Sequence, residues 1–137
     1  MLHFIFTFSN RLFTIFAAAL HLGGLNEHQT YHMGLYLLQT NESQQPLYKD
    51  NRPVYKHEAR DWFIYFISET PRWWIGPDIQ EAKGGLQVAD SHVLPEDITG
   101  TWKVWQDKEK RWVEDRNVTL QPGENLFPFL YANIIIV

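Results

Sequence analysis

The chain has 137 residues, enough for one domain, and it contains no cysteine, so disulfide bonds cannot stabilise it and a reducing compartment is weakly favoured. Its formal net charge is −4, and the densest basic cluster, residues 108–111, is interrupted and flanked by acidic side chains. A nucleic-acid interface needs an uncompensated basic face, so this composition argues against nucleic acid as a partner.

Residues 1–27 form an apolar N-terminal segment in which Arg11 is the only charged residue before Glu27. The apolar run behind Arg11 contains small residues at Ala17 and Ala19, which is typical of a secretory signal peptide. The alternative is a poorly ordered or packed N-terminal segment. The run is shorter than the roughly 18 apolar residues of a membrane span. We expect secretion if the segment is a signal peptide and a cytoplasmic protein otherwise.

Residues 28–119 are predicted to form the folded module, which contains all six tryptophans. Runs rich in β-branched and aromatic residues, separated by Gly, Pro and Asn turns, predict strands at 33–39, 52–56, 60–68, 72–76, 86–90, 101–106 and 111–114. Asp50-Asn51 is expected to form a turn before the second of these strands.

The central hairpin, residues 60–77, carries the most aromatic surface in the chain. Side chains alternate between the two faces of a strand, so Trp62, Ile64 and Phe66 should lie on one face. Phe63 and Tyr65, together with Ile67, should lie on the other. Because neither face is polar, both should be buried, which favours a barrel or a rolled sheet.

The sequence therefore predicts an all-β fold: a small antiparallel meander, barrel-like or rolled, of about six to eight short strands. Residues 120–137 form an apolar C-terminal tail after a turn expected at 121–124. The tail is too short to span a bilayer. A chain this small buries only about two thirds of its unfolded surface, so its large aromatic side chains should supply the core.

Several sequence blocks occur together in a particular order: Gly34-Leu35-Tyr36, Arg52-Pro53-Val54-Tyr55-Lys56, Trp62-Phe63-Ile64-Tyr65-Phe66, Trp74-Ile75-Gly76-Pro77, Pro95, and Trp102-Lys103-Val104-Trp105 with Trp112. Across residues 31–115 this order resembles a small Trp/Tyr-rich β module that recurs in multidomain eukaryotic proteins. The Arg-Pro block of that module usually follows Asn-Gly, whereas Asp50-Asn51 stand here. The resemblance implies a modular, non-catalytic domain and assigns no ligand and no site residue.

Two tryptophan pairs are candidates for a binding surface, although most single tryptophans of so small a domain should be core. Trp73 and Trp74 are adjacent and must face opposite ways in a regular strand. The positions of Trp102 and Trp105 differ by an odd number of residues, so these two side chains should also lie on opposite faces. Exposed aromatic side chains often anchor ligands. The predicted ligand-binding residues are Trp74, Trp105, Tyr36 and Tyr55.

The histidines give weaker signals. His28 and His32 have i, i+4 spacing beside Glu27, but a metal site would need a helix and further ligands, so no metal or other cofactor is predicted. His57, Glu58 and Asp61 could form an acid–base set, but no nucleophile motif accompanies them, and no catalytic residue is predicted.

Three functions follow from these observations. The first is a non-enzymatic binding module that recognises a protein segment or a glycan through exposed aromatic side chains. The second is a structural unit or fragment of a larger multidomain protein with no ligand of its own, and the third is a small hydrolase. Asn41-Glu42-Ser43 and Asn117-Val118-Thr119 match the N-glycosylation pattern, which matters only if the protein is secreted.

Overall fold

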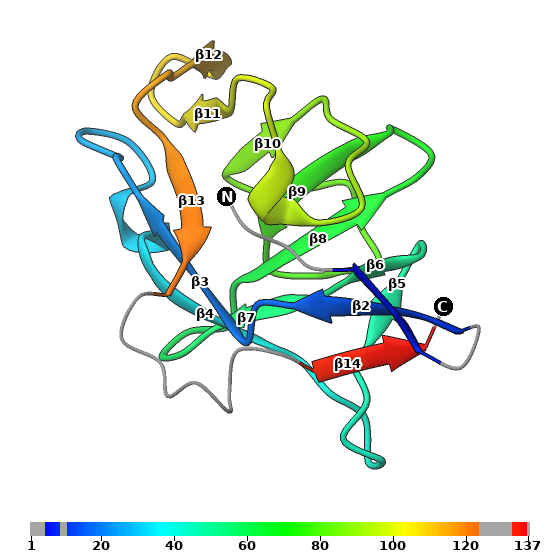
Figure 1. The fold of residues 1–137 in the computed structure, drawn as a ribbon. Helices are drawn as coiled ribbons and strands as arrows, with labels where there is room; N and C mark the ends of the chain where they lie inside the picture. Colours follow the sequence, from blue (N-terminus) through cyan, green and yellow to red (C-terminus); the bar gives the residue numbers. More distant parts are fainter. Residues whose placement is uncertain (1–4, 9–10, 124–132, 137) are drawn as a thin grey trace.

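A computed structural model describes residues 5–8, 11–123 and 133–136. The chain forms a curled antiparallel sheet of nine strands, shaped like half a barrel, with two smaller sheets beside it (Figure 1). The nine strands lie in the spatial order β12 (Arg111–Glu114), β11 (Lys103–Gln106), β10 (Leu86–Val88), β9 (Arg72–Gly76), β8 (Phe63–Ile67), β7 (Tyr55–His57), β4 (Gly34–Leu38), β3 (Ala19–Gly23) and β13 (Thr119–Pro122). The predicted all-β fold class is confirmed, although the main sheet has more strands than expected.

The smaller sheets use the remaining strands. One contains β1 (Ile5–Phe8), β2 (Arg11–Phe16) and β14 (Asn133–Ile136), and the other contains β5 (Tyr48–Lys49) and β6 (Arg52–Pro53). Single 3₁₀ turns occur at Thr30–His32 and Pro95–Asp97. Among the described residues, no helical segment has the length and apolarity needed to cross a bilayer.

The central hairpin consists of β8 and β9, which pair with Tyr65 opposite Trp74 and Phe66 opposite Trp73. Ile64, Phe66 and Trp73 belong to the main core inside the curl of the sheet. The main core comprises Leu20, Leu22, Leu25, Tyr36, Tyr55, Ile64, Phe66, Trp73, Ile75, Leu86, Val88, Trp102, Val104 and Val118. The period-two alternation thus assigned these hairpin residues to the correct common face.

The opposite face of the hairpin is covered as well. Tyr65, Ile67 and Trp74 form a second buried cluster, against which Phe63 and Trp112 pack. The loop after β9 lies over this face, since the Tyr65 hydroxyl donates to the carbonyl oxygens of Glu81 and Lys83 at 2.7 and 2.8 Å. A strand that is apolar on both faces is therefore buried on both, as predicted.

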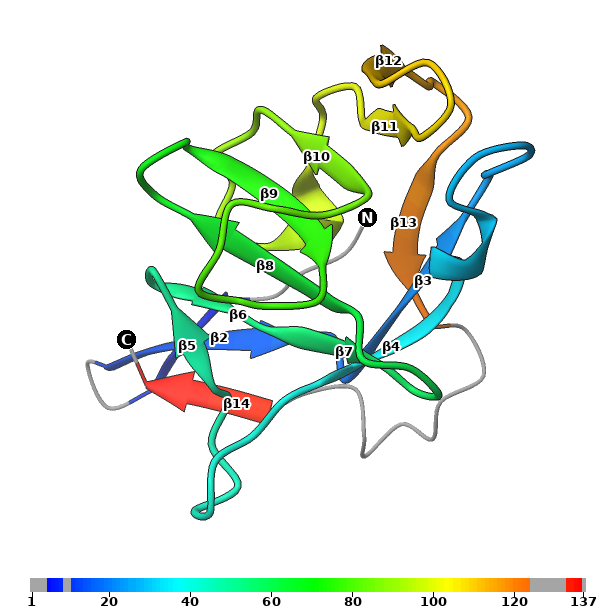
Figure 2. The same cartoon turned by 180° about the vertical axis from the view of Figure 1, so that it is seen from behind.

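One end of the main sheet uses residues that lie outside the predicted module of 28–119. β3 pairs with β4 on one side and with β13 on the other, and Leu20 and Leu22 of β3 are fully buried. Figure 2 shows β3 and β13 side by side. The turn expected at 121–124 is wrong over residues 121–122, where β13 continues; a proline is tolerated there because β13 is an edge strand.

The predicted tails are only partly described. In the C-terminal tail, β14 pairs with β2, with Ile134 opposite Ile15. The rest of that tail, residues 124–132 and 137, lies outside the described residues, as do residues 1–4 and 9–10 of the N-terminal segment. The interpretation of residues 1–27 as a signal peptide stays a prediction.

Asp50 and Asn51 form the expected turn between β5 and β6. Both have positive φ angles, 49° and 62°, and the strands pair directly before and after them, with Lys49 opposite Arg52. Positive φ at both central residues defines a type I′ hairpin turn, which Asn and Asp tolerate better than other non-glycine residues. The Asp50 carboxylate also accepts the Ser68 backbone N–H at 2.8 Å.

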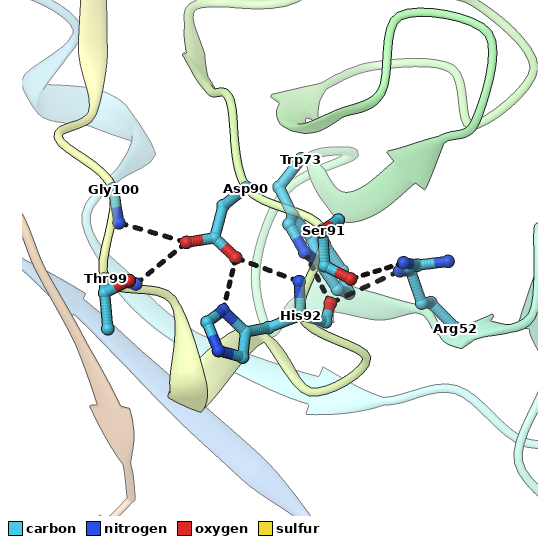
Figure 3. A network of polar contacts seen from close by, with 7 residues as sticks. All are labelled: Arg52, Trp73, Asp90, Ser91, His92, Thr99 and Gly100. Atoms are coloured by element: carbon cyan, nitrogen blue, oxygen red, sulfur yellow. Dashed lines mark hydrogen bonds and ion pairs between the residues drawn. The ribbon is translucent and has the colours of Figure 1, made fainter.

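A buried carboxylate organises the loop between β10 and β11 (Figure 3). Asp90 accepts hydrogen bonds from the backbone N–H groups of His92, Thr99 and Gly100 at 2.9–3.0 Å. Its other contact is with His92 Nδ1 at 2.6 Å. Burial alone would raise the pKa of Asp90, but these hydrogen bonds outweigh burial and lower the pKa below its ordinary value.

The same loop forms hydrogen bonds with side chains of β6 and β9. Trp73 Nε1 donates to the His92 carbonyl oxygen at 3.1 Å, and Arg52 donates to the carbonyl oxygens of Ser91 and His92 (Figure 3). The Arg52 guanidinium lies 3.7 Å from the centre of the Phe66 ring. The backbone of this loop thereby connects β6 and β9, and Arg52 extends the contact to Phe66 of β8.

Candidate functional site

The described part of the chain contains a cleft of about 540 Å³ whose walls are mainly aromatic. We call it the tryptophan cleft. It is lined by Gln29, Tyr31, His32, Trp62, Trp74, Pro77, Ala82, Lys83, Gly84, Gly85, Trp105, Asp107 and Trp112. Its volume is within the range of small-ligand sites in proteins.

The first wall consists of tryptophans from β9, β11 and β12, and β10 lies between β9 and β11 in the sheet. Trp105 of β11 lies directly opposite Trp112 of β12, with ring centres 5.3 Å apart. Trp112 also meets Trp74 of β9 edge to face at 6.1 Å. Trp105 and Trp112 are half-buried, whereas Trp74 is buried beneath them. Rings in these orientations support one another through edge-to-face contacts, which holds the wall in place.

The second wall comes from the 3₁₀ turn after β3 and from the residue before β8. His32 packs against Trp62 with ring centres 4.4 Å apart, and Tyr31 covers both rings at 4.7 Å and 5.7 Å. His32 is buried, while Tyr31 remains 43% exposed. Tyr31 is therefore the solvent-facing side chain of this wall.

Gln29 joins the two walls. Its side-chain Nε2 donates to the Trp105 carbonyl oxygen at 3.1 Å, and its Oε1 accepts from the Tyr31 hydroxyl at 2.7 Å. The same Oε1 lies 3.1 Å from His32 Nε2. Gly85 permits this arrangement, because a Cβ atom there would lie 2.4 Å from Gln29 Oε1 and 2.5 Å from His32 Nε2.

His32 is neutral at physiological pH. Burial, followed by the positive charges that His57 and Arg60 can carry, lowers the pKa of His32 to about 4. Since Nε2 faces the Gln29 oxygen, the neutral ring carries its proton there and leaves Nδ1 as an acceptor. Within the described residues, His32 Nδ1 and Trp62 Nε1 are both buried without a hydrogen-bond partner.

Trp62 apart, whose Nε1 is buried without a partner among the described residues, the indole N–H groups of the hairpin and cleft tryptophans fall into two sets. Those of Trp73 and Trp74 donate inside the fold, to the His92 carbonyl oxygen and to Thr70 Oγ1. Those of Trp105 and Trp112 have no acceptor among the residues that the structure describes. Each of the two half-buried cleft tryptophans therefore has an indole donor that no described residue accepts.

Of the four predicted ligand-binding residues, Trp74 and Trp105 line the cleft together. Tyr36 and Tyr55 do not. The expected exposure is wrong for three of the four, since Tyr36 and Tyr55 are fully buried and Trp74 is only 7% exposed. The two tyrosine hydroxyls donate to the carbonyl oxygens of His32 and Ala17 at 2.6 and 2.7 Å. Strand β4 is apolar on both faces, so its alternation does not reveal that Tyr36 faces inward while Leu37 faces solvent.

The two pairs of tryptophans divide between the faces as predicted. Trp73 lies in the main core and Trp74 in the second cluster, and Trp102 is in the main core while Trp105 is in the cleft. Trp112, Tyr31 and Trp62 were not among the predicted site residues. Trp112 could have been found from the β11–β12 hairpin, since a turn at 107–110 places it opposite Trp105.

The residues of the possible acid–base set do not bond to one another. His57 Nε2 lies 2.9 Å from the Met33 carbonyl oxygen, and its Nδ1 accepts the Ala59 backbone N–H at 3.0 Å. Asp61 is exposed and pairs with Lys56 at 3.3 Å. Both His57 nitrogens thus hold backbone groups in place.

The two histidines with i, i+4 spacing, His28 and His32, have different partners. His28 is 3.8 Å from Glu27, whereas His32 is bonded to Gln29 in the cleft wall. Over residues 5–8, 11–123 and 133–136, no three His, Asp or Glu side chains are grouped so that they could hold a metal ion.

Comparison of the chain with models of known protein families, with characterised proteins and with solved structures finds no match. The geometry of the tryptophan cleft is therefore the basis on which a function is assigned below.

Proposed function

We propose that this protein is a non-enzymatic binding module and that its ligand, a protein segment or a glycan, occupies the tryptophan cleft. The observation that carries this proposal is the cleft itself, about 540 Å³ in volume and walled by Trp62, Trp74, Trp105 and Trp112. Aromatic anchors in a preformed hollow are the usual origin of binding energy at recognition surfaces.

The walls are preformed, which lowers the entropic cost of binding. Gln29 forms hydrogen bonds with Trp105 and Tyr31, and the Trp112 ring contacts the rings of both Trp105 and Trp74. A ligand therefore does not have to order these side chains. Half-buried tryptophans would otherwise leave apolar surface in water, and covering them with a ligand is favourable.

The proposal is tested by screening the full chain against arrayed peptides and arrayed oligosaccharides, with tryptophan fluorescence as a second readout. We expect ligands that shift the fluorescence and whose binding is lost in Trp105→Ala. The control is Tyr48→Ala, which removes an exposed aromatic side chain outside the cleft lining. Ligands that bind Trp105→Ala as well as the unmodified chain would place recognition elsewhere.

A structural unit without a ligand of its own is the second candidate. It is favoured by the edges of the main sheet, since β12 and β13 each pair with only one strand among the described residues. Edge strands often mark where another chain or domain can add. Absence of any hit in both arrays would favour this candidate over the binding module.

A further inference from the structure

We infer that the tryptophan cleft binds a proline-rich protein segment in the polyproline II conformation. This inference rests on the proposed function and names the class of ligand. It follows from the polar groups that the cleft leaves free, from its aromatic walls and from the charges at its rim.

The accessible polar groups of the cleft are mainly donors. The indole N–H groups of Trp105 and Trp112 have no acceptor within the described residues, and an indole nitrogen can only donate. Lys83 adds an ammonium donor at the same cleft. A ligand that fits these groups should present acceptors.

The side-chain acceptors of the cleft are mostly occupied or covered. Gln29 Oε1 already accepts from Tyr31 and faces His32 Nε2. His32 Nδ1 is buried beneath the Tyr31 and Trp62 rings. Asp107, which is exposed, is the remaining carboxylate among the lining side chains.

A polyproline II segment matches this inventory. Its backbone makes no internal hydrogen bonds, so its carbonyl oxygens are free acceptors, and proline has no N–H to satisfy. Proline rings pack well on the faces of tryptophan and tyrosine, which is how proline-rich segments dock in aromatic grooves. The Trp105 and Trp112 indoles could donate to the ligand carbonyls while their rings cover the proline rings.

A glycan fits the same inventory less well. Each sugar hydroxyl brings a donor as well as an acceptor, and a buried donor without a partner is costly. Among its side chains, the cleft offers such donors the Asp107 carboxylate and the Tyr31 hydroxyl oxygen. The two charged side chains that line the cleft, Lys83 and Asp107, have opposite signs, which suits an uncharged segment better than a strongly acidic or basic one.

The test is a titration of the full chain with acetylated, amidated decaproline, followed by calorimetry and tryptophan fluorescence. A Gly-Ser peptide of equal length serves as the control peptide, and chitohexaose and cellohexaose serve as glycan probes. We expect decaproline to bind with a Kd below about 1 mM and the other three probes to bind at least about ten-fold more weakly.

Variants test the donor role. Trp105→Phe keeps an aromatic ring but removes the N–H, and it should weaken decaproline binding about two- to ten-fold, as expected for the loss of one neutral hydrogen bond. Trp105→Ala should weaken it further, and Tyr48→Ala should leave it unchanged. The thermal unfolding midpoint of each variant verifies that it is folded; if Trp105→Ala does not fold, Trp105→Phe still provides the test.

The outcomes separate this inference from the proposed function. Binding of an oligosaccharide that Trp105→Ala abolishes, without decaproline binding, would overturn the proline-rich ligand and leave the binding module standing. Decaproline binding that is equal in Trp105→Phe and the unmodified chain would overturn the donor role. No binding by any probe, and none in the peptide and glycan arrays, would contradict both.

Discussion

At the scale of single residues, polar groups inside this small fold are held by backbone partners. His57 uses both ring nitrogens on backbone groups, Asp90 gathers three backbone N–H groups, and the Tyr36 and Tyr55 hydroxyls reach backbone carbonyls. A chain with so little interior cannot leave such groups unpaired without a large loss of stability. His32 Nδ1 and Trp62 Nε1 are exceptions, because both are buried and lack a partner among the described residues.

The stability of the protein should depend on the neutral state of His32. Its pKa is about 4 in the folded protein against 6.5 for an ordinary histidine, so the unfolded chain binds the proton more readily. The contribution of His32 is therefore complete above pH 6.5 and declines as the pH falls towards 4, by about 3 kcal/mol in all. Chemical denaturation across this range measures the loss, and NMR titration of the His32 ring should give a midpoint near pH 4. A midpoint near 6.5 would contradict the burial of this ring.

Asp90 should be the most important carboxylate of the loop after β10. Asp90→Asn replaces an acceptor of several hydrogen bonds by a group that also donates, and it should lower the free energy of unfolding by about 2–4 kcal/mol. Asp61→Asn is the control, because Asp61 is 91% exposed at its side chain and pairs only with the surface residue Lys56, so its loss should cost less than about 1 kcal/mol. Equal effects in urea denaturation would show that the Asp90 contacts do not organise the loop.

At the scale of secondary-structure elements, the turn between β5 and β6 depends on its two positive φ angles. Asn51→Ala should destabilise the protein by about 1 kcal/mol, because residues with a side chain, other than Asn and Asp, adopt positive φ angles only at a cost in free energy. Asn51→Gly should not destabilise it, because glycine adopts positive φ freely. Thermal unfolding of both variants decides the matter, and an Asn51→Ala variant as stable as Asn51→Gly would count against the type I′ turn.

Strand β3 belongs to the fold even though its sequence lies in the predicted N-terminal segment. Leu22→Ala should lower the free energy of unfolding by about 2–5 kcal/mol, because this side chain is fully buried in the main core. Leu47→Ala is the matched control. Because Leu47 is 38% exposed, this substitution should lower the free energy of unfolding by less than about 1 kcal/mol. A Leu22→Ala variant with unchanged stability would show that β3 is not part of the cooperative unit.

The sequence predicted the strands and shared faces because these are local properties. The faces of Trp62 to Ile67 and the separation of Trp73 from Trp74 follow from alternation along one strand. Alternation does not say which face is inside when both are apolar, which is why Tyr36 was expected at the surface. The pairing of β3 with β13 joins segments about a hundred residues apart, and no local pattern reports it.

At the scale of the whole molecule, the tryptophans perform two separate tasks. Trp73 and Trp102 fill the interior of the curled sheet, where they supply the apolar bulk that a small cysteine-free chain needs. Trp105 of β11 and Trp112 of β12 lie on the opposite face of the sheet and form a wall of the cleft, above Trp74. The β8–β9 hairpin is thus buried on both faces, and the sheet positions the aromatic side chains of the tryptophan cleft.

This division can be measured by hydrogen exchange of the indole N–H groups in a ¹⁵N-tryptophan sample of the full chain. Trp73 and Trp74 donate to protein acceptors, so their N–H signals should exchange slowly, whereas those of Trp105 and Trp112 should exchange fast. Addition of a cleft ligand should slow the exchange of the Trp105 and Trp112 indole N–H groups and leave that of Trp73 unchanged. Equally slow exchange of all these indoles in the free protein would contradict the account, because the cleft would then have no free donors to offer.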